Sequence, residues 1–281
     1  MTDLLSLKGT FLRDGYCVLR NALAPEEVET LLSQTEKALS SKENEEDFLR
    51  INDSQHIHKI RYMFEKGEFF LKLLVHDAIL KIISELSDDI TRIVPTWEDM
   101  LIKIPKHGIP VTIHQDLALQ SAKYDVFSVG IYMHDSYDNP VYYLPGSYKM
   151  GPLTKTEIYE VYEKNKGKFV PIMAKAGDIV IHNVKTVHYS EKNESPNPRY
   201  TWYLEFRTID QLQKDSPWDQ EWINARRAIW IYALKKYRSD VSHLIPDEVS
   251  LKEYIEDLKL RVSHTNEYVD YDMKSPYNHF A

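Results

Sequence analysis

The stretch AGDIVIHNVKTVHYSEKNESPNPRYTWYLEFR, residues 176–207, indicates the fold more clearly than any other part of the chain. It predicts a β-strand, a histidine, a short polar loop and a second strand that opens on Arg199. Upstream, the only His-x-Asp of the sequence, His114-Gln115-Asp116, follows the β-branched run Val111-Thr112-Ile113. Two imidazoles and one carboxylate on a rigid β-scaffold make a facial triad that binds Fe(II) and leaves coordination positions open. The pattern therefore favours a non-haem iron site on a β-fold.

Short β-branched or aromatic runs separated by Pro, Gly, Asn and Asp continue from Met100 to Phe206. Many short strands with turn signals between them favour a sandwich or barrel over βαβ units. We expect strands at 101–104, 111–113, 126–133, 141–144, 169–173, 179–181 and 200–206. Helices are predicted at 25–39, 69–86, 155–166, 218–237 and 251–261, with Ser216 as the N-cap of the fourth. The charge run 40–47 is expected to be a loop.

The sequence has no internal repeat and no low-complexity linker, which predicts one domain over residues 1–281. Within it, we expect an N-terminal strand and helical support in residues 1–98. The β core should occupy 99–207, and a helical extension should occupy 208–281. That extension is expected either to cover the barrel or to form a homodimer contact.

The composition excludes several classes of protein. A formal net charge of −8, from 35 basic and 43 acidic residues, argues against broad nucleic-acid binding, which needs a concentrated basic surface. One cysteine, Cys17, within an apolar run, excludes an internal disulfide framework and indicates a buried thiol in a reducing compartment. The N-terminus lacks the apolar region of a signal peptide, and the apolar stretch 69–86 is interrupted by charges, so no membrane span is expected. We therefore expect a cytoplasmic protein.

Four blocks of the sequence together resemble the phytanoyl-CoA dioxygenase-like family of Fe(II)/2-oxoglutarate oxygenases. They occur in family order, and no block falls in residues 208–281. The third block has Tyr148 where the family usually has histidine. The blocks are FLRDGYCVLR (11–20) with LAPEEV (23–28), HQD (114–116), YLPGSYK (143–149), and AGD (176–178) followed by His188, Ser190, Asn193 and Arg199.

This resemblance implies a double-stranded β-helix, a jelly roll related to the cupins, with helices packed on one face. It also implies Fe(II) bound by His114, Asp116 and His188, with 2-oxoglutarate and O2 as co-substrates and ascorbate as a stimulant. His182 lies in the same segment and competes for the role of ligand. The family spacing, in which a small polar residue and then an asparagine follow the ligand, favours His188 and leaves His182 as a neighbour of the ligands or a structural residue.

The same resemblance predicts the co-substrate site. Arg199 and Thr201 are separated by one residue, so on a strand both side chains face one way. A guanidinium fork binds a carboxylate bidentately, and a hydroxyl adds a third hydrogen bond. Arg207 is the alternative arginine, but we expect it to lie past the useful end of the strand. By family analogy Tyr132 and Lys59 lie near the co-substrate or the pocket mouth, although a packing or surface role suits each equally.

The family's reaction converts 2-oxoglutarate to succinate and CO2 while a second substrate is oxidised. Retention of Asp116 favours hydroxylation, or a desaturation or rearrangement, because related halogenases have a small residue there. Candidate substrate contacts are His134, Tyr142, His58 and Arg61, which would suit a small polar or anionic molecule or else form a solvated face.

Two other classes of function share part of this pattern. A zinc hydrolase also uses His, His and Asp, but its chemistry does not call for Arg199. A non-catalytic cupin-like binding protein usually loses one member of the set, which is intact here.

Overall fold

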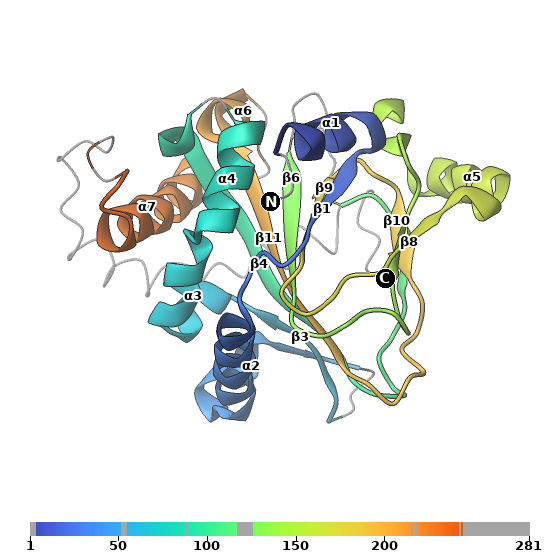
Figure 1. The fold of residues 1–281 in the computed structure, drawn as a ribbon, viewed down its shortest axis with the longest axis horizontal. Coiled ribbons are helices and arrows are strands. Elements are labelled where there is room, and N and C mark those ends of the chain that lie inside the picture. Colours follow the sequence, from blue (N-terminus) through green and yellow to red (C-terminus); the bar gives the residue numbers. More distant parts are fainter. Residues whose placement is uncertain are drawn as a thin grey trace.

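The computed structural model describes residues 4–51, 55–87, 89–116, 126–214, 216, 218–241 and 243. Its centre consists of two β-sheets that face each other, and every strand pair is antiparallel (Figure 1). The larger sheet has the order β1 (Tyr16–Leu19), β9 (Ile179–Asn183), β6 (Phe127–Tyr132), β11 (Arg199–Thr208), β4 (Ile93–Lys103), β3 (Ile57–Arg61) and β2 (Phe48–Arg50). The smaller sheet has the order β5 (Val111–His114), β10 (His188–Ser190), β7 (Val141–Tyr143) and β8 (Val170–Ile172). The predicted mainly β jelly roll with flanking helices is confirmed.

Strand β11 shows how the sequence divides the two faces of the larger sheet. Successive side chains of a strand point to opposite faces, so Trp202 and Leu204 belong to the main apolar core, whereas Arg199 and Thr201 point to the other sheet. The space between the sheets is filled on one side by an apolar cluster to which both sheets contribute. That cluster contains Tyr16, Tyr132, Val141, Tyr143, Ile172, Ala174 and Val180.

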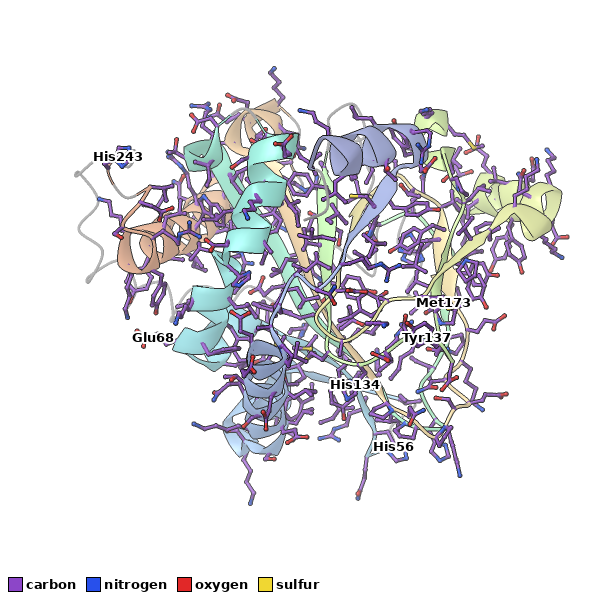
Figure 2. All side chains as sticks on the ribbon, viewed as in Figure 1. His56, Glu68, His134, Tyr137, Met173 and His243 are labelled. Atoms are coloured by element: carbon purple, nitrogen blue, oxygen red, sulfur yellow. The ribbon has the colours of Figure 1, made fainter. Side chains whose placement is uncertain are left out.

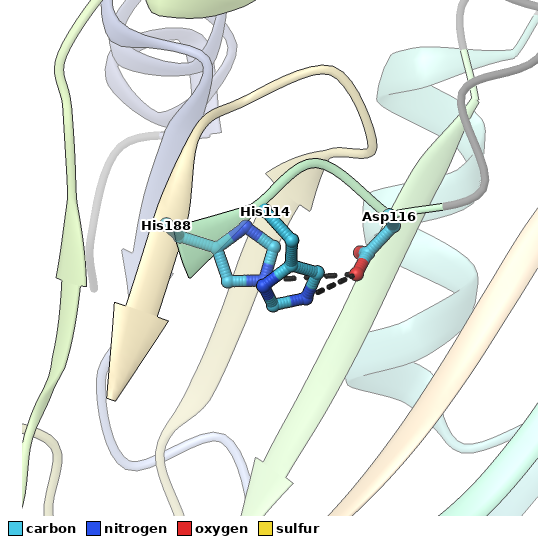
Figure 3. A group of neighbouring side chains, drawn as sticks. All are labelled: His114, Asp116 and His188. Atoms are coloured by element: carbon cyan, nitrogen blue, oxygen red, sulfur yellow. Dashed lines mark ion pairs between the residues drawn. The ribbon is translucent and has the colours of Figure 1, made fainter. Parts of the chain in front are cut away.

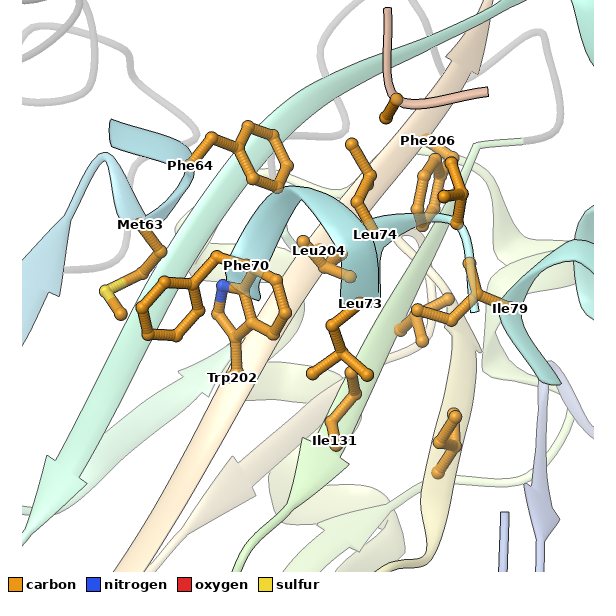
Figure 4. Packing of buried hydrophobic residues seen from close by; sticks show 14 of the residues in the cluster. Met63, Phe64, Phe70, Leu73, Leu74, Ile79, Ile131, Trp202, Leu204 and Phe206 are labelled. Atoms are coloured by element: carbon orange, nitrogen blue, oxygen red, sulfur yellow. The ribbon is translucent and has the colours of Figure 1, made fainter. Parts of the chain in front are cut away.

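Helices cover the apolar face of the larger sheet (Figure 1). They are α2 (Pro25–Ser40), α3 (Glu68–Leu74), α4 (Asp77–Leu86) and α7 (Gln220–Tyr237). In the contact between α3 and the sheet, the rings of Phe70 and Trp202 meet edge to face with their centroids 5.4 Å apart, and both residues are fully buried (Figure 4). Truncation of such a side chain to alanine typically costs about 3–5 kcal/mol of stability, so this contact fixes the strand that carries Arg199.

The remaining helices are peripheral. Helix α5 (Lys155–Asn165) packs on the outer side of the smaller sheet, where Ile158 joins Ile113 and Val187 in a separate apolar cluster (Figure 1). Helices α1 (Leu4–Asp14) and α6 (Ile209–Lys214) precede β1 and follow β11. Short 3-10 helices are η1 (Lys42–Asp47), η2 (Met63–Lys66), η3 (Ile90–Arg92), η5 (Ser147–Met150) and η6 (Lys166–Lys168). Within the described part of the chain, no helix has both the length and the apolar character needed to cross a membrane.

Gly15 anchors the turn after α1 to the segment that leads into β10. Its φ is +84°, and a Cβ atom there would lie 2.6 Å from Thr186 Oγ1. The Gly15 carbonyl accepts hydrogen bonds from the Asn183 backbone N–H at 2.8 Å and from Thr186 Oγ1 at 2.9 Å. Only glycine has the conformational freedom and the space for this position, and the contact holds the turn that precedes His188.

Several predicted elements have different bounds. The single helix predicted at 69–86 is wrong: α3 ends at Leu74 with Val75 as its C-cap, and His76 caps the separate helix α4 by accepting a hydrogen bond from the Ala78 backbone N–H at 3.2 Å. The predicted N-cap Ser216 is also wrong, since the Asp219 carboxylate caps α7 by accepting from the Trp222 backbone N–H at 2.8 Å. The segment 40–47 contains η1 instead of a plain loop. The helix predicted at 251–261 lies outside the described residues.

The predicted strands agree with observed ones, but β4 begins eight residues earlier than expected, at Ile93 instead of residue 101. Strands β2, β3 and β10 were not expected. They have only 3, 5 and 3 residues, so an alternating pattern is too short to detect, and each forms through pairing with a partner distant in sequence. The burial of Cys17 is confirmed.

Candidate metal centre

Three side chains meet at the inner side of the smaller sheet. His114 ends β5, His188 begins β10, and these two residues are directly paired across the antiparallel strands. Asp116 follows β5 by two residues. One potential ligand atom from each of the three residues lies within 4.8 Å of the others, and the Asp116 Oδ1 atom is 3.3 Å from His114 Nε2 and 3.6 Å from His188 Nε2 (Figure 3).

The backbone orients both imidazoles in the same way. His114 Nδ1 is 2.8 Å from the Thr112 carbonyl oxygen, and His188 Nδ1 is 2.8 Å from the Thr186 carbonyl oxygen. These Nδ1 contacts orient each ring so that its Nε2 atom faces the cluster, an arrangement common among metal-binding histidines. The Asp116 backbone N–H donates to the Val184 carbonyl at 2.9 Å, which fixes the carboxylate from the other side.

The electrostatic environment favours the protonation states that bind metal. Burial, and then the nearby His114, lower the pKa of His188 well below its usual value. Burial alone would raise the pKa of Asp116, but His188 and His182 together with hydrogen bonds from His114 and His182 lower it well below its usual value. A neutral His188 and an ionised Asp116 are the forms of these two groups that bind a metal cation.

His182 lies beside this group. Its Nε2 atom is 2.6 Å from Asp116 Oδ2, the oxygen that points away from His114 and His188, and its Nδ1 atom is 3.2 Å from the Tyr143 hydroxyl. A chain of hydrogen bonds therefore runs from Tyr143 through His182 to Asp116. This position agrees with the interpretation of His182 as a neighbour of the candidate ligands. The contact of Tyr143 with His182 could be recognised only from the pairing of β7 with β10.

Arg199, Thr201 and Tyr132 lie together on the inner face of the larger sheet. Thr201 is paired with Tyr132 on the neighbouring strand, and Arg199 precedes Thr201 on the same face of β11. All three residues are almost completely buried. Arg199 Nη1 donates to the Asn139 carbonyl at 2.7 Å. The Arg199 Nε and Nη2 atoms, the Thr201 hydroxyl and the Tyr132 hydroxyl form no hydrogen bond with any described residue.

Tyr203 is a further neighbour that the sequence did not indicate. It is paired with Gly130 on β6, and a Cβ atom at that glycine would lie 2.8 Å from Cε1 of the Tyr203 ring. The missing side chain of Gly130 therefore gives space for this ring. Burial raises the pKa of Tyr203, and the hydroxyls of Thr201 and Tyr132 lie near enough to influence it, although they do not meet it at hydrogen-bonding geometry within the described structure.

Lys59 and Arg61 have partners outside the cluster. Lys59 is on the inner face of β3 in the same cross-strand row as Thr201, but its Nζ atom pairs with Asp99 Oδ2 at 3.0 Å. Arg61 follows on the same face and donates to the Glu46 carbonyl at 2.9 Å. These two residues belong to the inner face of the larger sheet at β3, the strand next to the edge strand β2.

The structure does not bring His58, Tyr142 and His134 into the cluster. His58 alternates with Lys59 and therefore points to the helix-covered face of the sheet, where burial lowers its pKa to about 4. Tyr142 points to the outer side of β7 and stacks on Tyr189 at 4.9 Å. His134 accepts a hydrogen bond from the Tyr200 backbone N–H at the end of the sheet (Figure 2).

The expected position of Arg207 is wrong. It lies within β11, which continues to Thr208, because β4 provides a pairing partner along the whole strand. Its side chain is fully buried, and Nε pairs with Glu205 Oε1 at 2.7 Å, where Thr96 Oγ1 also donates at 2.6 Å. Arg207 thus has an acidic partner on its own strand.

Comparison with solved structures defines the class of fold. EctD from S. alaskensis, solved with 2-oxoglutarate and 5-hydroxyectoine, superposes with a TM-score of 0.63 at 18% identity, over 73% of this chain and 76% of that one. The non-haem α-ketoglutarate-dependent epimerase SnoN from nogalamycin biosynthesis superposes with a TM-score of 0.59 at 18% identity, over 73% and 83% of the two chains. At these identities the likeness concerns the fold, which is the jelly roll of the 2-oxoglutarate oxygenases.

Sequence comparison then identifies the family. Residues 11–201 match the phytanoyl-CoA dioxygenase (PhyH) family, so the chain belongs to it. A phytanoyl-CoA dioxygenase domain-containing protein 1 homolog from Dictyostelium discoideum is 26% identical over 258 residues, covering 69% of this chain and 87% of that protein. Family and fold together support an oxygenase that depends on iron and 2-oxoglutarate.

Proposed function

We propose that this chain is an Fe(II)/2-oxoglutarate-dependent dioxygenase in which His114, Asp116 and His188 hold the iron. The donor set fits Fe(II), because two imidazoles and one carboxylate on one face leave positions open for other ligands. Bound iron with 2-oxoglutarate would supply the oxidising chemistry, in which O2 is consumed and succinate and CO2 are released. The chain's own residues orient the ligands, bind the co-substrate and exclude water from the site.

The observation that carries the proposal is the pair of unused donors on Arg199. A buried cation without a counter-charge is costly, and buried donors without partners add to that cost. Arg199 Nε and Nη2 together with the Thr201 and Tyr132 hydroxyls offer donors to one carboxylate inside the barrel. The far carboxylate of 2-oxoglutarate would satisfy them. A zinc hydrolase has no use for this second group, so the same observation disfavours that alternative.

We further propose that the second substrate is a small polar metabolite or natural-product intermediate, and that the reaction is a hydroxylation. Asp116 supports hydroxylation because the carboxylate occupies the position that halogenases leave open. The inner face beyond the candidate iron site carries the buried pairs Lys59–Asp99 and Arg207–Glu205. An inner face with these charged side chains favours polar substrates over a hydrocarbon chain, because apolar groups cannot form hydrogen bonds or ion pairs with buried charges.

The test is anaerobic addition of Fe(II) and 2-oxoglutarate to the purified protein, followed by visible absorption. We expect a weak metal-to-ligand charge-transfer band in wild type and none in His114→Ala, which removes a ligand without touching the helix-packed core. Lys164→Met, an exposed charge on α5, serves as the control and should behave as wild type. Absence of the band in a protein that binds Zn(II) tightly would favour the hydrolase instead. Succinate release across a panel of polar metabolites would then identify the substrate.

A further inference from the structure

Lys103 lies next to Arg199 but belongs to a different strand. It ends β4 and is directly paired with Arg199 of β11, so both side chains point to the inner face. The residue is 1% exposed. Its Nζ atom donates to Ser190 Oγ at 2.8 Å and to the Glu191 carbonyl at 2.5 Å. Lys103 therefore bridges the two sheets, from β4 to the end of the strand that begins with His188.

Two buried basic side chains thus lie side by side. Neither Lys103 nor Arg199 forms an ion pair with an acidic side chain of the described residues. Arg207 and Arg226 are equally buried, yet each has a carboxylate partner, at Glu205 and Glu98 respectively. In a dry interior two adjacent basic groups can both carry a positive charge at low cost only when an anion is present. The contrast with the other buried arginines points to a missing anion at this position.

We propose that Lys103 is a second cationic group of the co-substrate site, which holds the Ser190 hydroxyl beside Arg199 and takes up a proton when the far carboxylate of the co-substrate binds. The inference rests on the proposed function, because it takes that anion to be 2-oxoglutarate. The neutral amine has two N–H donors, which suffice for Ser190 Oγ and the Glu191 carbonyl. Protonation adds a third donor, and this becomes favourable when a carboxylate arrives.

The electrostatics around Lys103 agree with this geometry. Burial, followed by the positive charge of Arg199, lowers the pKa of Lys103 to about 6, while the exposed Glu191 carboxylate opposes the shift. These are the charged groups that act on it from β11 and from the segment after β10. The amine is therefore mostly neutral at pH 7.5 in the free protein, and a bound anion raises its pKa.

Proton uptake by Lys103 makes the affinity for 2-oxoglutarate depend on pH. Above pH 6 the complex binds more protons than the free protein, so 2-oxoglutarate affinity falls as pH rises, by at most about tenfold per pH unit. The fall continues up to the raised pKa of the complex. Below pH 6 Lys103 is already protonated in the free protein, and the affinity should no longer depend on this group.

The experiment is anaerobic titration calorimetry of Fe(II)-loaded protein with 2-oxoglutarate at pH 7.5, in MOPS and in Tris, which differ in ionisation enthalpy. The dependence of the binding heat on buffer measures proton uptake. We expect wild type to take up a large fraction of one proton. Lys103→Met keeps the length and burial of the side chain; it should take up none and bind 2-oxoglutarate about tenfold or more weakly. Lys164→Met should match wild type in both respects.

The outcomes separate the two proposals. Failure of wild type to bind 2-oxoglutarate would overturn the proposed function and this inference with it. Tight binding without proton uptake, or equal uptake by wild type and Lys103→Met, would overturn the inference alone. If Lys103→Met does not fold, the pH dependence of wild-type affinity from pH 6 to 9 decides, because a flat profile contradicts the proposal.

Discussion

Replacement of Arg199 by alanine should weaken 2-oxoglutarate binding strongly. The side chain holds Asn139 through Nη1, while Nε and Nη2 remain as donors for a ligand. A hydrogen bond to a charged group contributes roughly 1.5–3 kcal/mol, so loss of both should cost roughly 3–6 kcal/mol. That corresponds to a rise of about 10²- to 10⁴-fold in Kd. We expect a value near the lower end, because Lys103 remains as a second cation.

Conservative replacement tests the geometry apart from the charge. Arg199→Lys keeps a cation but loses the fork that binds a carboxylate bidentately, so its affinity should fall between those of wild type and Arg199→Ala. Iron affinity should be nearly unchanged in both variants, because Arg199 contacts none of the three candidate ligands. The assay is anaerobic titration of the iron-loaded protein with 2-oxoglutarate, followed by visible absorption.

Arg207→Lys is the matched control, since Arg207 is an equally buried arginine on the same strand but has Glu205 as its partner. It should bind 2-oxoglutarate as wild type does. If Arg199→Ala binds 2-oxoglutarate as tightly as wild type while Arg207→Lys binds it weakly, the reasoning from unused donors is refuted and Arg207 is the co-substrate arginine.

Three further predictions concern the ligands and the core. His182→Ala should lower Fe(II) affinity about 10- to 100-fold, because the second oxygen of Asp116 loses the group that holds it; a competition titration with a chelator measures this, and unchanged affinity would argue against a positioning role. Asp116→Gly should abolish the proposed hydroxylation by removing a candidate ligand, and near-normal product yield by mass spectrometry would show that the carboxylate is dispensable. Arg226→Met should reduce the free energy of unfolding in urea by about 3–5 kcal/mol, because it leaves the Glu98 carboxylate buried without its partner. If the loss comes from this unpaired carboxylate, adding Glu98→Leu to the same chain should recover much of it.

Much of the fold could be predicted from local patterns. Strands β5, β6, β7, β8, β9 and β11 follow β-branched and aromatic runs between turn residues, and α2, α5 and α7 follow helical periodicity. The residues of the candidate metal centre could also be predicted from the sequence. His114 and Asp116 are two positions apart after a strand, and the segment with His188 has a recognisable spacing. These features depend on neighbours in sequence, and backbone geometry translates their spacing directly into direction.

Tertiary structure decided which distant residues meet. The sequence does not reveal that Lys103 is paired with Arg199, that His182 contacts Asp116, or that Tyr142 points outward. Each of these facts follows from strand register, and a shift of one residue would exchange the two faces of a strand. Register is set by packing between segments more than a hundred residues apart, such as Trp202 against Phe70. Residue types and local spacing therefore determined the candidate ligands, whereas their hydrogen-bond partners and the second buried cation depended on the packing of the complete sheet.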